Sequence, residues 1–141
     1  MKKLITIIFI LYASFSLSGC ASSTGQIVDS ESESQVQVRS YQTREYEVNK
    51  QLAIRSVISV LQDLGFVIDR ADSLTGTVSA TKLAGYKIEM TVTMRQKGET
   101  TTTVRANAQI GIKAITEPEI YQDFFISLDK SIFLEKNLQY I

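Results

Sequence analysis

The residues from Tyr86 to Arg95 alternate between apolar and polar side chains without a break, and this run constrains the fold more than any other feature. Its apolar parity holds Tyr86, Ile88, Met90, Val92 and Met94. A hairpin connection at residues 96–99 leads to a second alternating run, whose inward parity is expected to hold Thr102, Val104, Ala106, Ala108, Ile110 and Ile112. This period is typical of an antiparallel sheet with one buried face and one face in water.

Two segments predict helices that can cover the apolar face of this sheet. Asn49 can cap a helix over residues 50–64, and Gly65 can end it. The apolar side of this helix is expected to hold Ala53, Ile54, Val57, Ile58, Val60, Leu61 and Leu64. Leu52 falls outside this pattern.

A second helix is predicted near the end of the chain. Thr116 and Glu119 have the spacing of a capping box, and Pro118 lies in the tolerant first turn. The apolar stripe of this helix consists of Tyr121, Phe124, Phe125, Leu128 and Ile132. Such a stripe indicates core packing.

Three further strands are expected. Residues 35–48 read as one long or interrupted first strand, with a break near Ser40 and one parity made of Val36, Val38, Tyr46 and Val48. Residues 66–68 restart the chain as a strand, and residues 71–73 form a turn candidate. A strand over residues 75–83 follows, with Val78 and Ala80 inward.

Together these elements predict one two-layer α+β domain over residues 35–141. The order is β-α-β-β-β-β-α, with an antiparallel sheet and two helices packed on one of its faces. Residues 20–34 are rich in serine and acidic residues, so they are expected to form a disordered tether of typical reach ~20 Å. Residues 1–19 are expected to be a signal peptide.

The start of the chain has the features of a secretory signal. Lys2 and Lys3 precede an apolar run over residues 4–13, which is shorter than the ~20 residues that a spanning helix needs. The run leads to Leu17, Ser18, Gly19 and Cys20. These four residues resemble the lipobox of bacterial lipoproteins. The alternative is an ordinary secretory signal that is cut after Gly19 and leaves a free thiol.

The lipobox resemblance implies a lipid anchor. Cleavage before Cys20 would follow attachment of a diacylglyceryl group to its sulfur, often with a further acyl chain, such as palmitate, on the new amino terminus. Two or more such chains anchor a protein stably to a bilayer. Ala21 and Ser22 follow the cysteine in place of the aspartate that usually retains such proteins in the inner membrane. The resemblance therefore implies the periplasmic face of the outer membrane.

Composition argues against several kinds of chemistry. The chain has no histidine and no cysteine besides Cys20, so a structural zinc site and histidine-dependent nucleophiles are not expected. Asp63, Asp69 and Asp72 are the carboxylates considered for acid–base work, but they fall at predicted helix ends and turns, where capping explains them. The sequence has no basic patch, so nucleic acid is not expected as a partner. It also has no cofactor motif. We expect a protein that is not an enzyme.

The segments Leu61–Phe66 and Gly76–Lys82 carry a second resemblance. A helix that ends in Leu-Gly-Phe, a strand, a turn and a strand led by glycine is similar to the BamC-like helix-grip domain of Gram-negative outer-membrane lipoproteins. The resemblance spans about residues 40–135 and implies a helix-grip fold. This sequence pattern mostly reflects the requirements of turns and core packing, so it says little about function.

Two functional hypotheses follow. In the first, the chain is a lipid-anchored, non-catalytic interaction or accessory module of a cell-envelope complex, in contact with the membrane through Cys20 and with another envelope protein. Ile126 and Phe133 are its candidate partner contact, and the polar face of the sheet is a second candidate surface. Both surfaces can also be ordinary solvated faces.

In the second hypothesis, the domain carries an apolar ligand between helix and sheet. The candidate lining of such a cavity is Met90, Met94, Phe124 and Phe125. The same four residues can instead fill a solid core.

Overall fold

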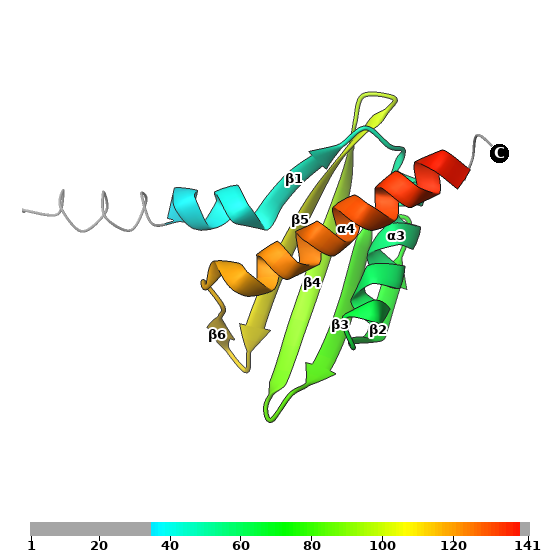
Figure 1. Cartoon of the computed structure of the whole chain (residues 1–141). Coiled ribbons are helices and arrows are strands. Elements are labelled where there is room, and N and C mark those ends of the chain that lie inside the picture. Colours follow the sequence, from blue (N-terminus) through cyan, green and yellow to red (C-terminus); the bar gives the residue numbers. More distant parts are fainter. Residues whose placement is uncertain (1–34, 139–141) are drawn as a thin grey trace, which may run out of the picture. The chain divides into compact units, whose positions relative to one another are not determined.

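A computed structural model describes residues 35–138, and these residues belong to one compact unit. Its centre is an antiparallel sheet (Figure 1). In spatial order the sheet consists of β1 (Thr43–Tyr46), β5 (Thr101–Ile110), β4 (Lys87–Lys97), β3 (Thr77–Leu83) and β2 (Val67–Asp72). A two-residue strand, β6 (Lys113–Ala114), extends the sheet beside β5 and was not predicted.

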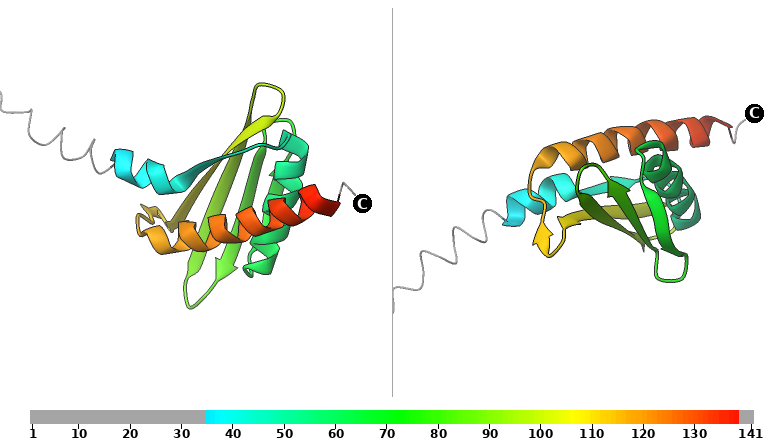
Figure 2. Two further views of the ribbon diagram at one scale, coloured as in Figure 1. Left: turned by 45° about the horizontal axis from the view of Figure 1, so that its top comes forward. Right: turned by 90° about the horizontal axis from the view of Figure 1, so that it is seen from below.

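Two helices, α3 (Lys50–Asp63) and α4 (Pro118–Leu138), cover one face of this sheet (Figure 2). The α+β class, the antiparallel sheet and the layered arrangement of the two helices are therefore confirmed. The chain order agrees with the prediction apart from β6 and an extra helical segment at residues 35–42.

The core lies between the two layers, and its buried apolar residues all fall between Val48 and Ile132. The inward parities of the central strands are buried as predicted at Val78, Ala80, Ile88, Met90, Val92, Met94, Thr102, Val104, Ala106 and Ala108. The stripe of α4 is buried over its whole predicted length, from Tyr121 to Ile132. Ala108 lies beneath α4, where the Tyr121 hydroxyl accepts a hydrogen bond of 3.1 Å from the Ala108 amide.

The predicted first strand is wrong over its first half. Residues 35–42 are helical, and only the four residues of β1 pair with β5. Val36 is exposed, whereas Tyr41 contacts the ring of Tyr121, with 5.8 Å between the centroids, and its hydroxyl donates to the Thr116 carbonyl. Two valines two residues apart are too short a pattern to exclude a helix, and in the helix Tyr41 packs against Tyr121.

Helix α3 begins as predicted and buries more than predicted. The Asn49 side chain accepts a hydrogen bond of 2.9 Å from the Leu52 amide, and Gly65 has φ of 83° at the other end. Leu52 and Ser56 are both buried, although neither was placed on the apolar face. They lie in the same helical row as Ser59, which borders α4, so this row faces the second helix rather than the sheet.

Two local predictions at element ends need correction. Strand β2 continues through Asp72, and the turn occupies residues 73–76 because the Asp72 carboxylate accepts from the Leu74 and Thr75 amides. At the start of α4, the carboxylate that accepts from the Thr116 amide belongs to Glu117, at 3.1 Å, and not to Glu119. The capping function is present, but a neighbouring residue supplies it.

The sheet also extends further than the helices that cover it. Tyr86, Ile110 and Ile112 have the inward parity in the sequence, but the structure leaves all three exposed. They lie at the end of the sheet where β3 passes to β4 and β5 passes to β6. The alternation is therefore correct as a strand pattern, and it overestimates how much of the apolar face is covered.

Gly76 is where the β2–β3 turn touches the neighbouring strand. Its φ is 71°, its carbonyl accepts from the Met94 amide at 2.7 Å, and an added Cβ would lie 2.3 Å from the Met94 oxygen. Gly98, in the β4–β5 hairpin, has a similar φ of 69° with no atom within 4 Å of the same position.

We predict that Gly76→Ala lowers the free energy of unfolding by about 2–4 kcal/mol, from backbone strain and displacement of β4 together. Gly98→Ala is the matched control, and it should cost only the strain, about 1 kcal/mol. Urea denaturation measures both. Equal losses for the two variants would contradict the close approach at Gly76.

Candidate functional site

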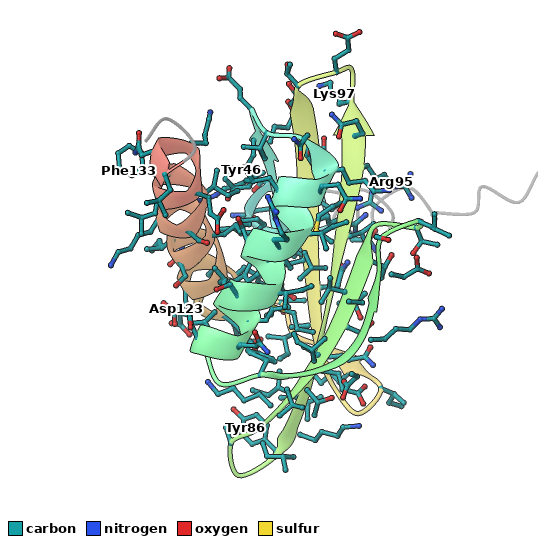
Figure 3. All side chains as sticks on the ribbon, turned by 90° about the vertical axis from the view of Figure 1, so that its right-hand side faces the viewer. Tyr46, Tyr86, Arg95, Lys97, Asp123 and Phe133 are labelled. Atoms are coloured by element: carbon teal, nitrogen blue, oxygen red, sulfur yellow. The ribbon has the colours of Figure 1, made fainter. Side chains whose placement is uncertain are left out.

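A groove of about 460 Å³ lies at the end of the sheet where the strands extend beyond the helices that cover them. It lies among the residues after α3, the β3–β4 loop, the end of β5 and the start of α4. Figure 3 shows Tyr86 at this end of the molecule, with Asp123 projecting from α4 on the helix side. The lining residues are Leu64, Phe66, Lys82, Ala84, Tyr86, Ile88, Met90, Ile110, Ile115, Glu117, Glu119, Ile120 and Asp123.

Most of the groove is apolar because it continues the core outward. Ile88 and Met90 are buried members of the sheet face, whereas Tyr86 and Ile110 continue the same parity into solvent. Gly85 turns the β3–β4 loop with φ of 78°, and this returns the chain at once toward β4. The groove is thus the uncovered remainder of the apolar sheet face.

Lys82 forms a fixed part of one wall. Its ammonium donates to the Leu64 carbonyl at 2.8 Å and lies 5.6 Å from the centroid of the Phe66 ring. Leu64 is the C-cap of α3, so the positive charge meets the negative end of that helix. These two contacts hold the lysine in place beside the groove.

The opposite wall is acidic. Glu117, Glu119 and Asp123 line the groove from the first turns of α4 and the residue before it. Acidic side chains are favoured there because the amino-terminal end of a helix carries a partial positive charge. An apolar groove with carboxylates along one side suits an apolar segment that carries a positive charge.

Of the carboxylates considered for acid–base work, Asp69 and Asp72 have structural partners. Within residues 35–138, no three carboxylates or other ligand-type side chains are placed to hold a metal ion. Of the considered carboxylates, Asp69 accepts from the Thr81 hydroxyl at 2.6 Å and Asp72 caps a turn. Asp63 ends α3 and borders a separate hollow between the two helices.

The structure places the predicted partner contact outside the groove. Ile126 and Phe133 are 62% and 66% exposed on α4, and neither lines the groove. Phe133 and Tyr86 lie toward opposite ends of the domain in Figure 3. Of the predicted ligand cavity, Met90 alone lines the groove, and all four residues are buried in the core.

Leu17, Ser18, Gly19 and Cys20 lie outside the described residues, as do the predicted signal and tether. Among residues 35–138, the helices are too short or too polar to span a bilayer. The sequence pattern did not predict the groove, because its position depends on how far the helices extend along the strands. The glycines beside the terminal apolar residues, Gly85 and Gly111, were the available signal.

Polar and charged side chains on the exposed face of the sheet form hydrogen bonds and ion pairs with one another. Glu89 accepts from Lys87 and, at 2.9 Å, from Gln109 on the adjacent strand. These bonds hold the pKa of Glu89 below its usual value. The hydrogen bond to Glu89 in turn raises the pKa of Lys87. At the other end of the sheet, Lys97 pairs with Glu45 at 2.8 Å and lowers the pKa of that carboxyl.

A second cluster joins the edge strand β1 to α4. Asp129 accepts from Arg44 at 2.5 Å and from the Tyr46 hydroxyl at 2.7 Å. The Arg44 guanidinium also lies 5.0 Å from the centroid of the Phe125 ring. Burial, reinforced by the bond to Asp129, raises the pKa of Tyr46 well above its ordinary value. Ile126 and Phe133 lie one helical turn on either side of Asp129.

No protein-family model matches this chain, and a comparison with curated proteins finds no relative.

The Tyr46 cluster predicts a loss of stability in alkali. Because folding raises the pKa of Tyr46, its contribution is complete below the unfolded value of about 10 and is lost as the pH rises above it. We expect Tyr46→Phe to flatten the alkaline fall in melting temperature. Tyr86→Phe, at an exposed tyrosine, is the control and should keep the wild-type fall. Identical profiles for Tyr46→Phe and the wild type would contradict a pKa of Tyr46 that folding raises.

Proposed function

We propose that this chain is a lipid-anchored, non-catalytic accessory module of a cell-envelope complex, and that its groove holds an apolar segment of another envelope protein. The observation that carries the proposal is the open apolar groove at the end of the sheet, with its wall of three carboxylates. The segment that it suits is apolar and is flanked by lysine or arginine.

The sequence supplies the anchor in this proposal. Leu17, Ser18, Gly19 and Cys20 have the pattern of a lipobox, and the serine-rich, acidic residues after Cys20 suit a solvated spacer. Ala21 and Ser22 favour the outer membrane. The helix-grip resemblance of Leu61–Phe66 and Gly76–Lys82 is consistent with a small envelope lipoprotein.

The shape of the groove favours a polypeptide segment over an enclosed small molecule. Met94, Phe124 and Phe125 fill the space between helix and sheet, so the hollow begins only where this packing ends. Residues from the sheet, both helix ends and two loops contribute to it. An open groove of this kind suits an extended or helical apolar segment.

A carrier of an apolar ligand is the second candidate function. The groove volume of about 460 Å³ favours it, since small-molecule sites typically have volumes of ~300–1,000 Å³. Native mass spectrometry of the purified chain distinguishes the two functions. A bound lipid of constant mass supports the carrier, and its absence supports the module.

Crosslinking in intact cells tests the proposed module. A photo-reactive p-benzoylphenylalanine in place of Ile120, which lines the groove, should give a covalent adduct with a specific envelope protein. The same replacement at exposed Ile126, three residues further along α4 from the groove residue Asp123, is the matched control and should give little of that adduct.

The crosslinked peptide identifies what the groove holds. The proposal expects an apolar stretch with an adjacent lysine or arginine. An adduct from position 126 but not from position 120 would move the contact to the surface that contains Ile126 and Phe133. The absence of any protein adduct at both positions would contradict an interaction module.

A further inference from the structure

Two neighbouring loops at the groove end of the sheet expose apolar side chains. Leu83, the last residue of β3, is 81% exposed, and Tyr86 in the β3–β4 loop is 56% exposed. Ile110, the last residue of β5, is partly exposed, and Ile112 in the β5–β6 loop is fully exposed. Gly85 and Gly111 both have positive φ, which allows each loop to turn tightly. We call these four apolar residues the apolar tip.

The sheet register brings the two loops together. Ile88 of β4 pairs with Ile110 of β5. The residues that precede Ile88 and those that follow Ile110 therefore leave the sheet at the same end. Tyr86 and Ile110 also share the wall of the groove. Figure 1 shows the two loops projecting from the lower end of the sheet, beyond α3 and α4.

The charged residues next to the tip are lysines. Lys82 precedes Leu83, Lys87 follows Tyr86, and Lys113 follows Ile112. Lys87 pairs with Glu89, and the acidic groups of the groove lie on its α4 wall. Exposed leucine, isoleucine and tyrosine with adjacent lysines is the composition that partitions into the interface of a bilayer.

The chain also enters the domain close to this tip. Gln35, the first described residue, lines a hollow of about 320 Å³ together with Ala114 of β6, two residues after Ile112. In the proposed function, residues 20–34 are a flexible spacer, and ~14 such residues typically reach ~20 Å, whereas a domain of ~100 residues is roughly 30 Å across. An anchor at Cys20 would then hold the entry side of the domain, and the tip beside it, toward the bilayer.

We infer that the apolar tip docks on the lipid bilayer and orients the domain with its groove opening at the membrane interface. The anchor in this inference rests on the proposed function, but the contact of the tip with lipid is a separate property of the folded domain. Leu83 and Ile112 enter the acyl region, and Tyr86 lies at the level of the headgroups.

The composition of the chain permits a direct test. Cys20 is the only cysteine and there is no tryptophan, so residues 20–141 can be coupled at one site to vesicles and can carry one reporter. The vesicles contain phosphatidylethanolamine, a minority of phosphatidylglycerol, and a trace of maleimide-bearing lipid. Chemical coupling replaces acylation, so the result does not depend on whether cells acylate Cys20.

With Tyr86→Trp as the reporter, we expect a blue shift of emission and quenching by brominated acyl chains. Leu74→Trp is the control, because Leu74 is an apolar residue that is 91% exposed in the turn at the opposite end of β3. It should emit as in water. A water-like emission from Tyr86→Trp on the vesicles would overturn the inference and leave the groove to a protein alone.

A matched pair of double variants tests whether the tip itself drives the contact. In the Tyr86→Trp background, Leu83→Ser/Ile112→Ser should lower the inserted population ~10-fold or more, because each leucine or isoleucine contributes through its burial. Leu74→Ser/Ile126→Ser removes the same two side-chain types elsewhere and should leave the population unchanged. Equal losses from both pairs would overturn the inference. All four serine sites are exposed, and circular dichroism checks that each variant is folded.

Discussion

The fold depends on a sheet with only one apolar face. That face spans the long strands β3, β4 and β5, and its burial against two helices is the main favourable term in folding a domain that contains no disulfide. The layers, the chain order and the position of the core all follow from this requirement. The burial of this face is incomplete, because α3 and α4 do not reach one end of the sheet. The groove and the apolar tip are what remains uncovered.

The sequence predicted the elements that this requirement controls. Period-two alternation placed Ile88, Met90, Val92 and Met94 inward, and the stripe of α4 was correct to the residue. Local capping chemistry placed Asn49 and Gly65 correctly. In each case the signal lies within a few residues of the position that it determines.

The larger failures involve contacts between distant segments, whereas the errors at the β2–β3 turn and at the start of α4 are local. Residues 35–42 are helical, and their Tyr41 contacts Tyr121, about 80 positions further along the chain, a contact that no local pattern reports. Leu52 and Ser56 are buried because α3 touches a second helix as well as the sheet. The groove could not be predicted for the same reason, since it depends on where two separate helices end relative to β4 and β5.

The proposed roles share one end of the domain. Ala84, Tyr86 and Ile110 line the groove, and two of them belong to the tip that we expect to touch lipid. A groove that opens at the membrane interface can receive an apolar segment of a partner where it leaves the bilayer, and the carboxylates of α4 can meet the basic residues that commonly flank such segments. The proposed module requires that the domain is held at a membrane through Cys20, whereas the contact of the tip with lipid is a separate property of the folded domain. The most direct test is metabolic labelling of the full chain with a clickable fatty acid, with the label mapped by mass spectrometry of the envelope fraction. The account predicts a mature chain that begins at acylated Cys20 and a Cys20→Ser variant without label. An unlabelled wild type, or undiminished label on the variant, would contradict it.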